Sequence, residues 1–143
     1  MRVTDLARRA DTTAETVRHY TELGLLRPDR DPANGYRRYG GDDLRRLRFA
    51  LKARGLGFTL GDVRALIEES ESGATPCPKV RALIETRLQE VEARIQELRG
   101  LSDRMQAAVA AWENAPDCRL EDGRVCGLID SFNAPEAGAR AGQ

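Results

Sequence analysis

The fold of the N-terminal part is decided by residues 3–23, VTDLARRADTTAETVRHYTEL. The apolar side chains of residues 3–10 recur at the i, i+3, i+4, i+7 spacing of one helix face and predict a first helix. Thr12 and Glu15 have capping-box spacing and predict a second helix that runs to about Leu23. Two short helices joined by a tight polar turn indicate a helix-turn-helix.

The next segment is interrupted by prolines and then by Asn34-Gly35, directly before Tyr36-Arg37-Arg38-Tyr39. An Asn-Gly pair favours a tight two-residue hairpin turn. The segment therefore predicts a small β-wing after the helix-turn-helix.

Two further helices are expected before the middle of the chain. Asp42 or Asp43 can cap a third helix, and Thr59 with Asp62 can open a fourth that ends near Glu69. Residues 1–70 are thus expected to form one domain, followed by a linker over residues 71–78, which is rich in Ser, Gly and Pro.

Residues 79–115 predict one long helix with a coiled-coil seam. The apolar seam steps alternately by four and three along Ile84, Leu88, Val91, Ile95, Leu98, Ser102, Met105, Val109 and Trp112, with Ser102 as its one polar member. A helix of 36 residues spans roughly 54 Å, which is too long for this chain to cover with its own core. We therefore expect a second chain to cover the seam; the alternative is a solvated single helix with its apolar stripe in water.

Charge and composition restrict the class of protein. The 143 residues carry 23 basic and 23 acidic side chains, but residues 1–60 hold 13 basic against 8 acidic, and the remainder holds 10 against 15. A phosphate-facing surface is therefore expected at the N-terminal end. No apolar run is long enough to span a membrane and no signal peptide is evident, so a cytoplasmic protein without a membrane partner is expected.

The three cysteines are candidates for metal or redox chemistry, because an odd count in a reducing compartment does not suggest a disulfide framework. Cys118 and Cys126 flank a seven-residue loop that can bring both thiolates to one ion, and Cys77 stands at the entrance of the long helix. Thiolates select soft or borderline ions, namely Hg(II), Pb(II), Cd(II), Zn(II) and Cu(I). Unligated thiols are the alternative. An effector loop with a short helix is expected over residues 116–133, and a disordered tail over 134–143.

Several separate motifs together resemble the MerR family of transcriptional regulators, in the right order and spacing. They are Thr16-Val17-Arg18-His19-Tyr20, Glu22-Leu23-Gly24-Leu25-Leu26, Pro28, Asn34-Gly35-Tyr36-Arg37-Arg38-Tyr39, Asp43-Leu44 and Ala53-Arg54-Gly55-Leu56-Gly57-Phe58. The match covers about residues 1–70, and the long helix is similar to that of metal-responsive members. The resemblance implies a mainly α fold: a winged helix-turn-helix, an antiparallel dimerisation coiled coil and a C-terminal metal-binding loop.

The function that the resemblance implies is activation by DNA distortion. A homodimer would bind double-stranded promoter DNA and, with its effector bound, bend and untwist it so that RNA polymerase can start. The predicted DNA contacts are Thr16, Arg18, His19 and Tyr20 on the second helix and Tyr36, Arg37 and Tyr39 on the wing. For the tyrosines, packing is the alternative role. An enzyme is not expected, since the cysteines lack a partner histidine.

The effector is expected to be a soft metal ion bound by Cys77 of one subunit with Cys118 and Cys126 of the other. A cysteine at Cys77 is similar to family sensors of divalent metals, whereas the spacing between Cys118 and Cys126 is similar to that of Cu(I) sensors. Divalent Hg, Pb, Cd or Zn is favoured over Cu(I). Cys118 also comes about six residues later than the family pattern places the first loop cysteine. The alternative function is a thiol-based sensor of electrophiles or oxidants.

Overall fold

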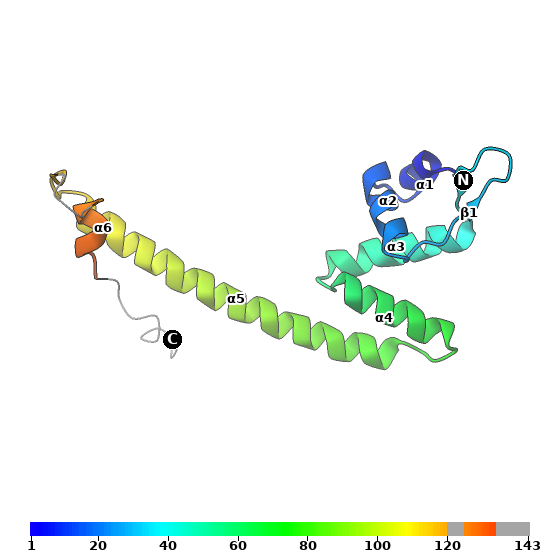
Figure 1. Cartoon of the computed structure of the whole chain (residues 1–143). Coiled ribbons are helices and arrows are strands. Elements are labelled where there is room, and N and C mark those ends of the chain that lie inside the picture. The colour runs from blue at the N-terminus through cyan, green and yellow to red at the C-terminus, as the bar shows by residue number, and fades with distance from the viewer. Residues whose placement is uncertain (120–124, 134–143) are drawn as a thin grey trace. The chain divides into compact units, whose positions relative to one another are not determined.

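The computed structural model describes residues 1–119 and 125–133 and divides into two compact units, residues 1–88 and 89–143 (Figure 1). The middle of the predicted effector loop and the predicted tail, residues 120–124 and 134–143, lie outside the described residues. Among the described residues, no helix is long and apolar enough to cross a membrane.

The helix-turn-helix is formed by α1 (Val3–Arg9) and α2 (Ala14–Glu22). The cap of α2 is one residue later than predicted, because the Thr13 hydroxyl, not that of Thr12, accepts the backbone N–H of Thr16 at 3.1 Å. The helix consequently begins at Ala14, and Glu15 lies in its first turn, where a negative charge is favourable.

The wing consists of two short antiparallel strands, β1 (Asp29–Arg30) and β2 (Arg37–Arg38). The wing is present as predicted, but its turn is wider than the tight turn expected at Asn34-Gly35, since a loop over residues 31–36 joins the strands. Gly35 adopts a positive φ of 72°, and the Asn34 side chain accepts the Tyr36 backbone N–H at 3.0 Å. These interactions form a broader loop that carries Tyr36 at its end.

Helices α3 (Gly41–Gly55) and α4 (Leu60–Glu71) complete the predicted domain. α3 begins after Gly40, and Asp43 acts from the third helical position: its carboxylate accepts the backbone N–H groups of Gly40 at 3.0 Å and Arg27 at 2.8 Å. α4 begins as predicted, with Thr59 and Asp62 in a reciprocal capping box.

One hydrophobic core holds the first unit together. Its buried members are Leu6, Ala7, Val17, Tyr20, Leu25, Leu26, Tyr39, Leu47, Ala50, Ala53, Phe58, Val63 and Leu66. Val80, Leu83 and Ile84 of the following helix pack against this core. The start of the long helix therefore belongs to the first unit.

The long helix α5 (Cys77–Trp112) has 36 residues and begins two residues before the predicted start. The helices α4 and α5 are thus separated by residues 72–76, and the division between the two units falls inside α5, after Leu88. Most of the predicted seam is exposed in the single chain, as shown by Ile95 at 41%, Met105 at 58% and Val109 at 67%. This apolar stripe has no cover from the described residues of its own chain.

The short helix α6 (Gly127–Ser131) lies against the end of α5. The Trp112 indole N–H donates to the Leu128 carbonyl at 3.2 Å, and the Trp112 and Phe132 rings meet edge to face at 5.6 Å. Trp112, the expected last member of the seam, is therefore the anchor of α6.

The buried carboxylate of Asp62 ties α5 to α4. It accepts two hydrogen bonds from the Arg87 guanidinium, at 2.8 Å from Nε and 2.9 Å from Nη2, and one from the Thr59 backbone N–H at 2.9 Å. The Arg87 hydrogen bonds lower the pKa of Asp62 to about 2, against the opposing effect of burial and with further help from Thr59. The two-pronged pair fixes the first turns of α5 on the core.

We predict that the Asp62 carboxylate stabilises the fold in a pH-dependent way. Its folded pKa lies below the ordinary 3.8, so its contribution is complete above about pH 5 and is lost as the pH falls towards 2. The difference in unfolding free energy between the wild type and Asp62→Asn should be on the order of 1–2 kcal/mol at pH 6 and should shrink by pH 2. Urea unfolding at fixed protein concentration measures it.

Asp42→Asn is the matched control, since it removes an exposed carboxylate that pairs with Arg45 at the surface of α3. It should change stability by less than about 0.5 kcal/mol. A pH-independent difference for Asp62→Asn would contradict the assigned pairing.

Candidate nucleic-acid interface and thiol site

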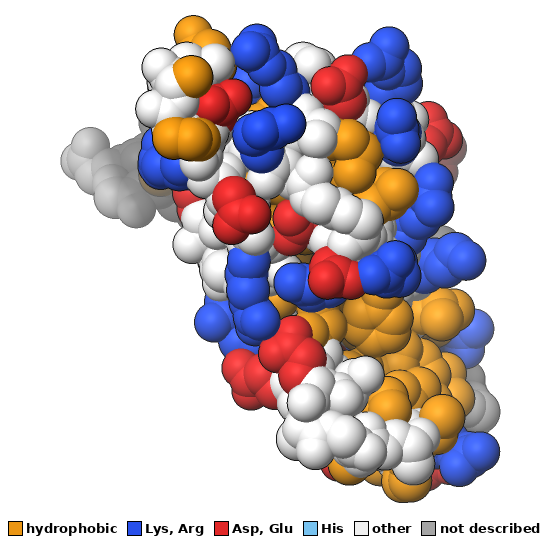
Figure 2. All heavy atoms as spheres, turned by 90° about the vertical axis from the view of Figure 1, so that its right-hand side faces the viewer, with side chains coloured by type: hydrophobic (Ala, Val, Ile, Leu, Met, Phe, Trp, Pro, Cys, Tyr) orange, Lys and Arg blue, Asp and Glu red, His pale blue; other side chains and the backbone are white. Residues whose placement is uncertain are grey.

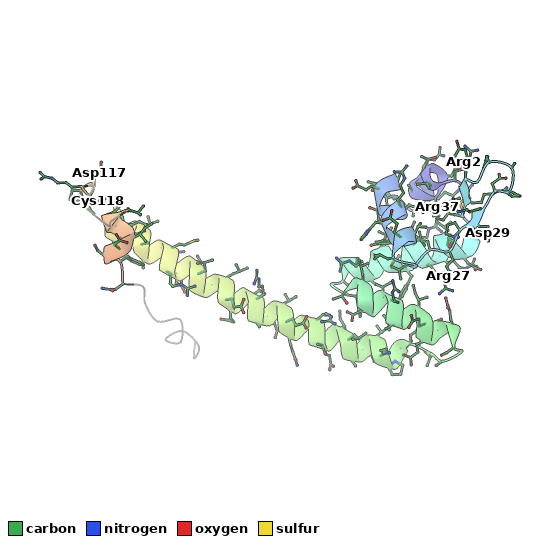
Figure 3. The ribbon with its side chains drawn as sticks, in the orientation of Figure 1. Arg2, Arg27, Asp29, Arg37, Asp117 and Cys118 are labelled. Atoms are coloured by element: carbon green, nitrogen blue, oxygen red, sulfur yellow. The ribbon has the colours of Figure 1, made fainter. Side chains whose placement is uncertain are left out.

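A basic hollow lies where α1, α2 and the wing meet. It has a volume of about 400 Å³ and is lined by Arg2, Val3, Thr4, Arg18, Arg30, Gly35, Tyr36 and Arg37. Four of these eight residues are arginines, which carry planar sets of donors suited to phosphate oxygens. Figure 3 labels two of them, Arg2 beside α1 and Arg37 on the wing.

Neighbouring groups hold two of the four arginines of the hollow in place. The Arg2 guanidinium lies over the Tyr36 ring, 5.0 Å from its centroid, and Arg30 Nη1 donates to the Gly35 carbonyl at 3.0 Å. Each guanidinium has five N–H donors, so these contacts leave donors for a ligand. The hollow is therefore a pre-arranged set of cationic donors facing solvent.

Among the predicted DNA contacts on α2, Arg18 and His19 are exposed and Thr16 is half-buried next to the Thr13 hydroxyl. On the wing, Tyr36 is 58% exposed and Arg37 is half-buried. Of these residues, Arg18, Tyr36 and Arg37 line the hollow, and a contact of Thr16 and His19 with DNA stays a prediction.

Two of the predicted contacts have buried rings. Tyr20 and Tyr39 belong to the core, and the Tyr39 hydroxyl hydrogen-bonds the Thr21 hydroxyl at 2.8 Å. Their burial favours the alternative role, in which the rings pack in the core. A contact with DNA stays a prediction for both.

Sequence reasoning missed Arg2, Thr4 and Arg30 as members of the hollow. A signal for Arg30 was available, because hairpin pairing places it opposite Arg37. Arg2 joins only through the fold: the Met1 amino group donates to the Tyr39 carbonyl at 2.9 Å, and this brings the start of the chain to the end of the wing. Figure 2 shows basic side chains over the face turned to the viewer, with acidic side chains between them.

The second candidate site is the thiol pair of the second unit. Cys126 is the N-cap of α6 and is half-buried, and it makes a side-chain hydrogen bond with Cys118. Cys118 is exposed and is labelled in Figure 3. Backbone N–H groups of Ile129 and Leu128 and a hydrogen bond from Cys118 lower the pKa of Cys126, against the effects of burial and of the Asp130 charge. A lowered pKa favours the thiolate, which is the form that binds metals and reacts.

The structure brings two of the three predicted thiols together. Cys77 is the exposed first residue of α5 and belongs to the other unit. Within the described part of the single chain, no group of three metal-ligating side chains is assembled. The donors of the pair fit a soft ion, which can be held linearly by two thiolates or take a third ligand from elsewhere.

Comparison with known proteins identifies the family of the chain. A family model described as MerR HTH family regulatory protein matches residues 1–70, and one described as MerR, DNA binding matches residues 44–108. The chain belongs to the MerR family. Members of this family are DNA-binding transcription regulators, and the chain is accordingly a regulator and not an enzyme.

Relatives within the MerR family include metal-responsive regulators. The HTH-type transcriptional regulator HmrR of Rhizobium leguminosarum bv. viciae is 34% identical over 84% of this chain and 94% of its own. The mercuric resistance operon regulatory protein of Shigella flexneri is 31% identical over 94% and 89%. The crystal structure of PbrR691 from Ralstonia metallidurans CH34, in complex with lead(II), superposes with a TM-score of 0.70 at 28% identity, covering 92% of this chain and 98% of that one.

We predict that Arg18→Ala and Arg37→Ala weaken binding to duplex DNA of any sequence, because the hollow is expected to contact phosphates. Each substitution should also lower the slope of log affinity against log salt by about 1. Fluorescence anisotropy with a random-sequence duplex over a salt series measures both quantities.

Arg81→Ala is the matched control, since Arg81 is an exposed arginine of α5 outside the hollow. It should leave the salt slope unchanged. Equal losses for Arg81→Ala and Arg37→Ala would argue against a phosphate site in the hollow.

Proposed function

We propose that this MerR-family protein is a homodimeric regulator that activates transcription by distorting promoter DNA when a soft metal ion is bound by its cysteine thiolates. The observation that carries the proposal is the pairing of Cys118 with Cys126 at the end of α5. The metal-responsive relatives support it.

The exposed stripe of α5 supports the homodimer. Large apolar side chains such as Leu88, Val91 and Leu98 are more than half exposed in the single chain. An antiparallel second copy would cover them with the same residues and remove the stripe from water. Each dimer would then carry two basic hollows, one for each half-site of a pseudo-palindromic promoter.

The predicted DNA contacts would serve activation by distortion rather than by chemistry. Arg18 and Arg37, with Arg2 and Arg30, would hold phosphates while the duplex bends and untwists between the two hollows. Such deformation costs several kcal/mol and is offset by the contacts that it permits. RNA polymerase would then find its promoter elements aligned.

The thiol pair supports a soft ion, with divalent Hg, Pb, Cd or Zn favoured over Cu(I). Cys77 of the partner subunit would complete a three-thiolate site with Cys118 and Cys126. Within one chain, Cys77 begins the 36-residue helix α5, and Cys118 and Cys126 follow its other end, so the third thiolate would come from the second copy.

The contacts of α6 suggest how the bound ion would act on the protein. Cys126 caps α6, and α6 is anchored on Trp112 at the end of α5. An ion held by Cys118 and Cys126 would cross-link the two ends of the loop and fix α6 on the dimer helix. Such fixing would bias the dimer towards the DNA-distorting state.

We predict that Ile95→Asp prevents dimer formation. The charge lies in the middle of the stripe, where a partner helix would have to bury it without a counter-ion. Analytical ultracentrifugation should show a loss of the dimer, or a rise of at least about tenfold in its dissociation constant.

Gln96→Asp introduces the same side chain at the next residue, outside the seam, and should leave the dimer intact. A wild-type protein that sediments as a monomer would overturn the homodimer, and so would an unchanged dimer in Ile95→Asp.

We predict that the reduced, metal-free protein binds one divalent soft ion per subunit and that Cys77→Ser, Cys118→Ser or Cys126→Ser each loses that binding. Titration with Hg(II), Pb(II), Cd(II), Zn(II) and Cu(I), followed by thiolate-to-metal absorption, measures it. If only Cu(I) binds and Cys77→Ser leaves that binding unchanged, Cys118 and Cys126 bind the ion without Cys77.

A thiol-based sensor of electrophiles or oxidants is the second candidate, and the lowered pKa of Cys126 beside Cys118 favours it. Absence of stoichiometric binding for every ion in the titration would replace the metal sensor by this function. Oxidation of the pair to a disulfide, with an accompanying change in promoter activity, would then be its positive test.

A further inference from the structure

A hollow of about 590 Å³ opens beside the thiol pair. Its walls are Ala111, Trp112, Ala115, Pro116, Asp117, Cys118, Gly127, Leu128, Ser131, Phe132 and Asn133. A bare ion held by two or three thiolates does not fill a partly apolar space of this size. The hollow therefore points to a ligand with a substituent on its thiol-binding atom.

The walls of the hollow are suited to an aromatic group. Trp112 and Phe132 meet edge to face, and the only N–H of the indole ring is already used by the Leu128 carbonyl. The remaining indole surface is apolar, and aromatic rings pack favourably against such surfaces at offset or edge-to-face geometry. Ala115 and Pro116 extend the apolar lining, and Cys118 places a thiol in the wall.

We propose that the thiol pair and the hollow together bind trivalent arsenicals that carry one aryl group, with arsenic on Cys118 and Cys126 and the ring in the hollow, against Trp112 and Phe132. This inference rests on the thiol pair of the proposed function and names a ligand class for it. It does not require Cys77.

The number of bonds that the central atom forms distinguishes an aryl-arsenic ligand from an aryl-mercury ligand. Trivalent arsenic forms three single bonds, so an aryl-arsenic centre takes two thiolates and directs its third substituent, the ring, away from them. An aryl-mercury cation takes one thiolate and leaves the second thiol unused. The pair of thiols beside one apolar hollow fits the arsenical.

The binding step is a substitution without redox change. An aryl-arsonous acid, with two As–OH groups, reacts with two thiols: two As–O bonds break and two As–S bonds form. Each thiol proton leaves with a hydroxide as water, and arsenic stays trivalent. No further reactant is needed.

The test compares phenylarsonous with methylarsonous acid on the reduced full-length protein, in competition with dithiothreitol. Dithiothreitol binds both arsenicals through two sulfur atoms and so cancels the intrinsic arsenic–thiol chemistry. Trp112 is the only tryptophan of the chain, and its fluorescence reports occupancy of the hollow. We expect the wild type to prefer the phenyl compound by at least about tenfold, through burial of the ring.

Ala115→Phe fills the hollow and should abolish the phenyl preference while methylarsonous binding stays unchanged, which also shows that the site is intact. Ala110→Phe makes the same change outside the hollow and should keep the preference. Cys77→Ser should bind both arsenicals as the wild type does, and Cys118→Ser should bind neither tightly.

Equal affinity of the wild type for the two arsenicals would overturn this inference, and so would an undiminished preference in Ala115→Phe. If the soft metal ions still bind stoichiometrically in that case, the proposed metal sensor stands without it. If neither the ions nor the arsenicals bind, the thiol pair is not a ligand site and both proposals fail.

Discussion

The first unit depends on the buried pair of Asp62 and Arg87. The carboxylate caps α4 through Thr59 and receives both prongs of the Arg87 guanidinium from α5. A buried charge that loses its partner is strongly destabilising, so neither member can be removed without disturbing the other. Together with the packing of Val80 and Ile84, the pair makes the first turns of α5 part of the DNA-binding core. A change in the path of α5 is thereby a change in the placement of that core.

The second unit differs from the first, because its described residues form almost no buried core. Among its described residues, Ala108 and Gly127 are the buried ones, whereas the large side chains of the seam face solvent. The hydrophobic effect then favours association with another apolar surface. Since Trp112 ends this helix and anchors α6, the sensor proposed at the thiol pair would be built on the same helix that is proposed to form the dimer.

Local signals in the sequence were sufficient for most of the fold. The helices of the first unit and the long helix follow from apolar periodicity and caps, as for Thr59 with Asp62. The errors came from choices between neighbouring residues: Thr13 caps α2 instead of Thr12, and the wing loop is wider than Asn34-Gly35 alone indicates. The basic hollow and the tie between Asp62 and Arg87 could not be predicted, because they join residues that are distant in sequence and adjacent only in the fold.

The departure of this chain from the family pattern and the apolar hollow have a common origin. Cys118 comes about six residues later than the family resemblance places the first loop cysteine, and Ala115, Pro116 and Asp117 of the intervening segment line the hollow. A loop that began directly after Trp112 would lack this wall and would hold its first thiol at the helix end. The additional residues therefore move the first thiol away from the end of the helix. They also form a space that an ion alone does not fill. A larger, partly apolar ligand, as in the arsenical proposal, would account for both features at once.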